Sequence, residues 1–226
     1  MKGERDYLGH RERIRSRFLK NGLDGFADYE VIELMLNWLV PRRDVKPIAK
    51  QLMREFGSLR DVLDASVDEL REVEGIGPQS ACGIKVQRAI VEHYLQQRSM
   101  DEPVDTDMRA LKEYCRAKLG SEEIEVFLVF YLDSSRKIIG EDELERGTID
   151  RAAVYPREVI QAAMRKGAVS IILAHNHPGG KLEPSDHDKT MTRAIELAGD
   201  PLQIRVDDHL IVSADVVFSF RESGLL

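Results

Sequence analysis

The segment HNHPGGKLEPSDHD at residues 175–188 holds the side chains with the clearest chemistry in this sequence. His175 and His177 stand two apart after the apolar run AVSIILA, and Asp188 follows a short loop of proline and glycine. Two imidazoles and one carboxylate form a three-ligand set for zinc, which catalytic sites commonly complete with a water molecule. The segment therefore predicts a metal-dependent hydrolase that holds one zinc ion per chain.

Two elements must position these ligands, a strand before the histidines and a helix after them. The run AVSIILAH (168–175) carries apolar side chains on both faces, as expected for a central strand with both faces covered. Residues two apart on a strand point to the same side, so both imidazoles can face one ion. The stretch SDHDKTMTRAIELAGD (185–200) predicts a helix whose first turn carries Asp188.

Plainer interpretations of the same residues stay open. Ser185 and Asp188 also fit a capping box that only starts a helix, and the two roles are compatible because a cap fixes the carboxylate. Two histidines beside a proline-glycine turn can be ordinary surface side chains. His187 is an alternative metal ligand by its position between Ser185 and Asp188, but we expect its side chain to face solvent. We expect His209, in VDDHLIV, to be buried and hydrogen-bonded. The alternative is that His209 orients a metal ligand through a hydrogen bond.

Strand and helix patterns alternate after Gly120. The pattern predicts a helix at 108–120, a hairpin formed by EVFLVFYLD and KIIGEDEL, a helix at 156–167, and closing strands at 202–213 and 216–220. This order indicates an α/β domain.

The first half of the chain shows only helical and turn patterns. Helices are predicted at 27–40, 45–57 and 78–97, with two short helices that begin at Ser58 and Ser66. RSMDEPVDT (98–106) is polar and lacks periodicity, so we place the linker there. The sequence therefore predicts an all-α domain at 1–98 and an α/β domain at 104–226.

The composition argues against several classes of protein. No stretch approaches the ~20 apolar residues of a membrane span, and the polar N-terminus is unlike a secretory signal. We therefore expect a cytoplasmic protein without a membrane partner. Cys82 and Cys115 lack metal-like spacing, which excludes a thiolate-rich zinc site. The net charge is −7, but residues 1–100 carry 17 basic and 16 acidic side chains, so any polyanion contact belongs to this half.

The chain also resembles a known family over nearly its whole length. H-N-H-P, a short loop and P-S-x-x-D resemble the JAMM motif of MPN-domain metalloproteases, and the match is closest to RadC-like proteins. Gly179 and Lys181 depart from the family's usual serine and aspartate, which leaves the ligands intact and puts loop shape and substrate contact in doubt. Further similar segments are GHRERIRSRFLKNGLDGFADYEVIELML, VPRRDVKPIAKQL, FGSL, EVEGIGP, Gly147-Thr148, YPREV and DHLIV.

The resemblance implies a fold and a mechanism. The fold is an α/β domain of MPN/JAMM (cytidine-deaminase-like) type, preceded by an all-α domain with a helix-hairpin-helix motif. A glutamate at the start of the domain's first strand activates the zinc-bound water, and Glu125 matches that position. Glu143, Glu145 and Glu158 stay open alternatives because spacing does not exclude them. The Ser185 hydroxyl would donate a hydrogen bond to the oxyanion. Relatives cleave peptide or isopeptide bonds, so a protein or peptide is the expected substrate.

The stretch VEGIGPQSACGI (73–84) resembles the helix-hairpin-helix motif, which binds nucleic-acid backbones without reading sequence. Gly75 and Gly77 would let backbone amides approach a phosphate at the start of the next helix, and Lys85 would add a charge. A tight turn between packed helices and a protein-binding module are the alternatives, and the acidic residues before the hairpin weaken the nucleic-acid interpretation.

Two other functions therefore remain beside the hydrolase. One is a DNA-binding or repair-associated protein that binds DNA tightly and in a salt-sensitive way through residues 1–97, with the MPN domain as a scaffold. The other is an MPN-shaped interaction module without turnover, against which the intact ligand set argues. Beside the hydrolase function, weak nucleic-acid binding by the N-terminal domain also stays open. The oligomeric state is not determined by the sequence, and a homodimer stays open.

Overall fold

The computed structural model describes residues 3–41, 43–147 and 154–226 and divides the chain into two compact units. The first unit ends at Ile90 and the second begins at Val91, so the division lies inside one helix, α6 (Pro78–Asp101). The predicted linker at 98–106 lies beyond this division, and its first residues continue α6.

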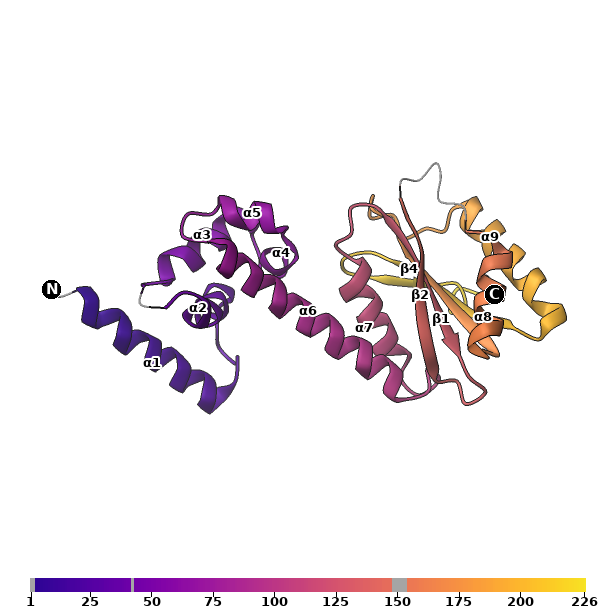
Figure 1. Ribbon diagram of the computed structural model, residues 1–226, viewed down its shortest axis with the longest axis horizontal. Helices are drawn as coiled ribbons and strands as arrows, with labels where there is room; N and C mark the ends of the chain where they lie inside the picture. The colour runs from indigo at the N-terminus through magenta and orange to yellow at the C-terminus, as the bar shows by residue number, and fades with distance from the viewer. Residues whose placement is uncertain (1–2, 42, 148–153) are drawn as a thin grey trace. The chain divides into compact units, whose positions relative to one another are not determined.

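The first unit consists of helices, as the sequence predicted. Apolar residues from α2, α3, α5 and α6, among them Ile32, Leu52, Leu70 and Ile84, form one buried core. Ser58 and Ser66 accept hydrogen bonds from Asp61 N and Glu69 N, which confirms both predicted N-caps. Before α6, Figure 1 shows α1 (Gly3–Asn21), α2 (Asp28–Leu39), α3 (Lys46–Phe56), α4 (Leu59–Asp64) and α5 (Val67–Glu72).

The second unit is built on a five-stranded sheet with the order β2-β1-β3-β4-β5. β3 and β4 are parallel, and the other neighbouring strands are antiparallel. The predicted hairpin is confirmed as β1 and β2. The strands are β1 (Glu125–Leu132), β2 (Ile138–Gly147), β3 (Ser170–Asn176), β4 (Arg205–Val212) and β5 (Val217–Ser219).

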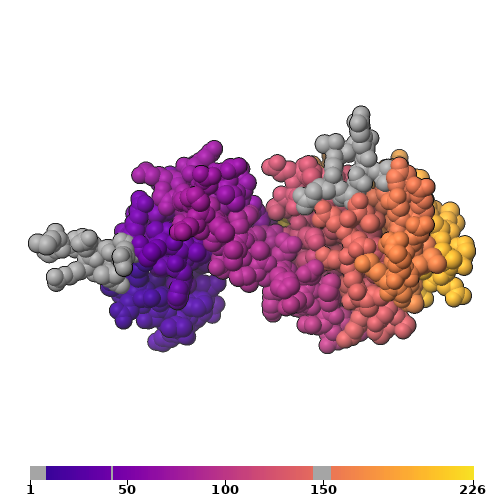
Figure 2. Space-filling view, viewed as in Figure 1, coloured from indigo at the N-terminus to yellow at the C-terminus, as the bar shows by residue number. Residues whose placement is uncertain are grey.

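Helices cover both faces of this sheet, which confirms the predicted α/β class. On one face, α7 (Met108–Leu119) packs with the apolar side chains that include Leu128 and Phe130. On the other face, α8 (Pro156–Lys166) and α9 (Asp186–Gly199) pack with those that include Phe127 and Val129. Figure 1 shows the three layers, and Figure 2 shows α8 and α9 as part of the near surface.

The central strand β3 is buried along its whole length, because helices cover both of its faces and β1 and β4 flank it. A short 3-10 helix (Asp200–Leu202) links α9 to β4. No helix among the described residues combines the length and the apolar character needed to cross a bilayer.

Candidate metal centre

The two predicted histidine ligands lie at the end of β3, where the strand leaves the sheet. His175 is fully buried, whereas the side chain of His177 is 19% exposed and lies at the mouth of the site. Both Nε2 atoms converge to 2.9 Å from each other. The alternation of side chains along the strand therefore turns both rings to one side, as their spacing predicted.

Asp188 completes the cluster from the first turn of α9. Its Oδ1 lies 3.3 Å from His175 Nε2, and its Oδ2 lies 3.4 Å from His177 Nε2. One ligand atom from each of the three residues lies within 4.8 Å of the others, so the group could hold a metal ion. Ligand atoms around a tetrahedral zinc ion are about 3.3–3.5 Å apart, which these separations approach.

Ser185 holds the Asp188 carboxylate in this place. The Ser185 side chain accepts a hydrogen bond from Asp188 N, and Asp188 Oδ2 accepts from both Ser185 N and Ser185 Oγ at 2.7 Å. The capping box considered as a plain alternative is therefore present, and it is the same feature that orients the candidate ligand.

A backbone carbonyl fixes the orientation of the His177 ring. His177 Nδ1 lies 2.5 Å from the carbonyl oxygen of Lys181, and a carbonyl can only accept, so Nδ1 carries the proton. In the neutral ring, Nε2 then presents a lone pair to His175 Nε2 and to Asp188. Gly180, with φ +71° and an N–H that donates to His177 O, makes the turn that brings this carbonyl back.

The electrostatics of the cluster favour a cation at its centre. Burial alone would raise the pKa of Asp188, but the close contacts of its carboxylate with the imidazoles of His175 and His177 outweigh burial and hold that pKa far below its usual value. The nearby Asp188 carboxylate raises the pKa of His177 because it stabilises the protonated ring, and the charge of Glu125 acts in the same direction. Electron-rich atoms this close to one another favour a cation among them.

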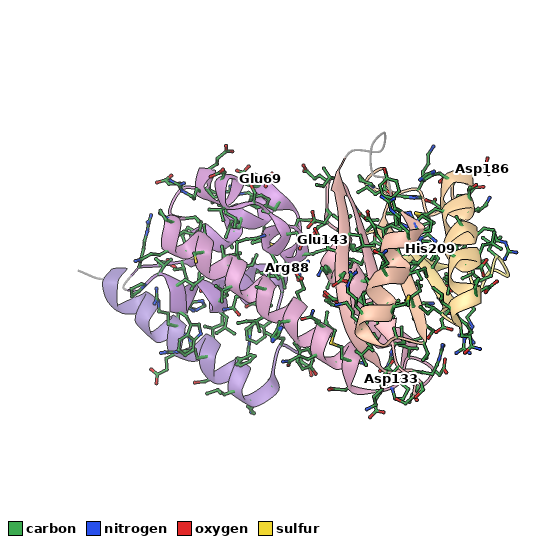
Figure 3. All side chains as sticks on the ribbon, turned by 45° about the vertical axis from the view of Figure 1, so that its right-hand side comes forward. Glu69, Arg88, Asp133, Glu143, Asp186 and His209 are labelled. Atoms are coloured by element: carbon green, nitrogen blue, oxygen red, sulfur yellow. The ribbon has the colours of Figure 1, made fainter. Side chains whose placement is uncertain are left out.

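His209 lies behind His175, next to the Nδ1 atom of that ring. It is fully buried on β4, and its Nε2 is 2.9 Å from His175 Nδ1. Burial lowers the pKa of His209 well below that of free imidazole. The expectation of a buried, hydrogen-bonded histidine is confirmed, and His187 is exposed, as expected. Figure 3 shows His209 inside the unit and Asp186 at the outer start of α9.

The start of β1 brings Glu125 to the same end of the sheet. Phe127 pairs with His175 in the antiparallel register, and the two rings stack with centroids 5.8 Å apart. Continuing this register by two residues puts half-buried Glu125 opposite His177, on the same face.

Glu143 and Glu158 are placed less favourably than Glu125 for contact with the ligands. Glu143 pairs with Leu128, which belongs to the core on the α7 face, and Glu158 is exposed on α8. Glu145 pairs with Phe127 along the backbone, but its side chain lies outside the described part of the chain, as does all of Thr148. Glu125 as the base thus stays a prediction, and the strand register favours it.

Asn176 is a buried residue of the site that the sequence interpretation missed. Its Oδ1 accepts from Val126 N at 2.8 Å, and its Nδ2 donates to Glu122 O and Ile124 O at 3.0 and 2.9 Å. One amide therefore ties the end of β3 to the backbone on both sides of Glu125. The position of an asparagine between two candidate ligands could have pointed to a role in the site. Its hydrogen-bond partners could not be identified, because they lie about 50 residues away in the chain.

Comparison with known proteins assigns both units to families. The RadC-like JAB domain model matches residues 105–225. The chain belongs to the RadC-like JAB domain family. The UPF0758 N-terminal model matches residues 7–82.

Full-length relatives agree with this assignment. The chain is 40% identical to UPF0758 protein FN0909 of Fusobacterium nucleatum, over 99% of both chains. It is 41% identical to UPF0758 protein SPO0054 of Ruegeria pomeroyi, over 96% of this chain and 97% of the relative. A UPF0758 protein of Rhodobacter capsulatus is 38% identical over 94% of this chain and all of the relative. The resemblance to RadC-like proteins is confirmed.

The two departures from the RadC-like motif fall in the exposed loop after His177. Lys181 acts on the site through its backbone carbonyl, a contact that does not depend on its side chain. A Cβ atom at Gly179 would meet nothing within 4 Å, so the position has room for the larger residue usual in the family. Neither departure disturbs the three candidate ligands.

In this RadC-like chain the helix-hairpin-helix residues have structural contacts of their own. Gly75 has φ +95°, and an added Cβ would lie 2.8 Å from Ile48 Cδ1, so close packing requires glycine there. Gly77 has open space around it. Lys85 Nζ donates to the carbonyls of Leu63, Asp64 and Ala65 at 2.8–3.0 Å. The three ammonium protons of Lys85 are therefore hydrogen-bonded to the end of α4. Nucleic-acid binding stays a prediction.

Proposed function

We propose that the second unit is a zinc-dependent amide hydrolase of the JAMM type, acting as a metallopeptidase. One observation carries the proposal: the Nε2 atoms of His175 and His177 and the carboxylate oxygens of Asp188 converge, with separations of 2.9, 3.3 and 3.4 Å. Imidazole and carboxylate together suit zinc. Three protein ligands also leave one position for water, as catalytic zinc sites do.

The residues around the cluster supply the remaining chemistry. Bound zinc would supply an activated water molecule and polarise the scissile carbonyl. The carboxylate of Glu125 would take a proton from that water and return it to the leaving amine. Ser185 gives its hydroxyl proton to Asp188 in this structure, so donation to an oxyanion would require that hydroxyl to rotate. Ser185 thus orients a ligand first, and oxyanion stabilisation stays a proposal.

The surroundings of the site support a polymeric substrate. His175 and Asp188 are buried, while the exposed loop 178–181 borders His177. An extended peptide or isopeptide segment can approach along that side without entering a closed cavity. We therefore propose a protein or peptide substrate, and the amide bond is the target that the resemblance to JAMM metalloproteases implies.

Metal binding is the first test. Zinc titration of the metal-free chain should show one tight site. His175→Ala should abolish zinc binding because it removes the buried ligand that contacts both His177 and Asp188. His187→Ala is the matched control, since this exposed histidine lies beside Asp188 and outside the cluster. No stoichiometric zinc in the wild-type chain, or unchanged binding in the His175 variant, would contradict the proposal.

Hydrolysis is the second test. The zinc-loaded chain and its variants are incubated with a proteome-derived peptide mixture, and new amino termini are counted by mass spectrometry. Glu125→Gln should keep zinc and lower cleavage about 100- to 10,000-fold, the range for loss of a general base. Glu123→Gln, at an exposed position just before β1, should cleave like wild type. Full activity in the Glu125 variant would assign the base to another residue.

A further inference from the structure

A chain of hydrogen bonds runs from His175 to the backbone of Asp188 behind the metal-binding side. His175 Nδ1 lies 2.9 Å from His209 Nε2, and His209 Nδ1 lies 2.6 Å from Thr192 Oγ1. Thr192 Oγ1 in turn lies 2.6 Å from the carbonyl oxygen of Asp188. All four residues are at most 3% exposed, so water does not compete for these contacts.

The last bond of the chain fixes the direction of the others. A carbonyl oxygen can only accept, so the Thr192 hydroxyl donates its one proton to Asp188 O. Toward His209 the same hydroxyl is left with a lone pair, and His209 Nδ1 must therefore donate. A neutral imidazole carries one ring proton, so His209 Nε2 accepts and His175 Nδ1 donates.

The surroundings keep His209 neutral and hold both rings in place. Phe220 stacks on His209 with centroids 4.6 Å apart and 26° between planes. Phe127 meets the same ring edge-on at 5.9 Å and stacks on His175. Aromatic walls on a fully buried ring disfavour the imidazolium and leave little room for the rings to turn.

We propose that Thr192 and His209 are positioning residues that fix the tautomer of His175, with its proton on Nδ1 and a lone pair on the Nε2 that faces His177 and Asp188. For metal binding, this inference rests on the proposed function. The tautomer itself is a property of the metal-free chain. A buried histidine without this chain would distribute its proton between both nitrogens, and metal binding would have to displace it from Nε2.

The tautomer can be observed directly in the full-length, metal-free protein. Histidine labelled with ¹⁵N gives different long-range ¹H–¹⁵N patterns for the two tautomers, recorded in alkaline buffer so that the rings are neutral. We expect an Nδ1–H pattern for both His175 and His209. An Nε2–H pattern for either ring in the wild-type chain would overturn the assignment, whatever the variants show.

Thr192→Val and Thr192→Ser form the matched pair of variants. Valine keeps the shape of threonine but removes the acceptor for His209 Nδ1, so His209 should move its proton to Nε2 and donate to His175 Nδ1. The His175 proton is then displaced to Nε2, and zinc affinity, measured by competition with a chromophoric chelator, should fall about 10- to 100-fold. Serine keeps the hydroxyl and should restore both the wild-type pattern and the affinity.

The outcomes separate this inference from the proposed function. An unchanged tautomer and an unchanged zinc affinity in the folded Thr192→Val variant would overturn the positioning role. A wild-type chain that shows the expected tautomers and binds no zinc would leave the hydrogen-bond assignment standing and end the metallohydrolase proposal. Loss of affinity in both variants, with unchanged tautomers, would reduce Thr192 to a packing residue and overturn the inference.

Discussion

Asn176 illustrates, at the scale of single residues, a role that depends on partners distant in sequence. The pattern His-x-His with Ser-x-x-Asp predicted three convergent ligands, because strand alternation and a helix N-terminus are local rules. Asn176 and Thr192 could not be assigned in this way. Asn176 binds backbone about 50 residues away, and Thr192 meets a histidine 17 residues away, so both roles exist only after the strands and α9 are packed.

We expect Asn176→Ala to uncouple hydrolysis from metal binding. The substitution leaves Val126 N, Glu122 O and Ile124 O without their buried partner. Unfolding in urea should therefore require about 1–3 kcal/mol less free energy. Zinc should still bind, because the three ligands remain, whereas cleavage should fall by roughly 100-fold if Glu125 shifts by about 1 Å.

His187→Ala serves again as the control for both measurements, since its side chain is exposed close to the same site. Wild-type cleavage by the Asn176 variant would show that the position of Glu125 does not depend on this amide.

At the scale of helices and strands, periodicity predicted most elements because it depends on neighbouring residues. The helix predicted at 156–167 is α8 (Pro156–Lys166), with Gly167 at φ +71° as its C-cap. Two features escaped. The sequence placed no individual helix over residues 3–21, and it ended the helix before the linker at 97, whereas α6 continues to Asp101. In a sequence, polar residues at the end of a helix cannot be distinguished from a linker, because the packing that keeps them helical is not visible there.

Lys85 is the residue where element packing changes a functional interpretation. After a Gly-x-Gly hairpin, a lysine suggests a phosphate contact, but α6 directs its ammonium to the last carbonyls of α4 and the residue that follows. Burial also lowers the pKa of Lys85. Arg88, further along α6 (Figure 3), adds an ion pair to Asp64 at 2.5 Å. These contacts indicate a role in holding α4 against α6.

Lys85→Met should therefore destabilise the first unit by about 1.5–3 kcal/mol, the range for lost hydrogen bonds to a charged group. The measurement is urea unfolding of the full chain, followed by a probe in the first unit. Lys20→Met, at an exposed position in the last turn of α1, is the matched control and should change little. Unchanged stability together with weaker, less salt-dependent nucleic-acid binding would instead support the phosphate contact.

At the scale of the whole molecule, the sequence predicted two domains, and the structure has two compact units with the division earlier in the chain. The reason lies in the C-terminal part of α6. Leu95 and Met100 pack against the sheet core that includes Leu111 and Phe130, and Arg98 pairs with Glu113 of α7 at 2.8 Å. In the sequence, these residues continue the helical pattern of the first unit. Only their packing contacts show that they belong to the second unit.

A chain that begins at Val91 should therefore fold more stably than one that begins at Val104. The shorter chain loses the partly buried Leu95 and Met100, which together contribute about 2–4 kcal/mol by burial of apolar area. Both chains keep His175, His177 and Asp188 and should bind one zinc ion, so zinc titration tests whether each is folded at the site. Urea unfolding with excess chelator compares their stability without metal. Equal midpoints would show that the end of α6 contributes nothing to the second unit and would favour the predicted start at 104.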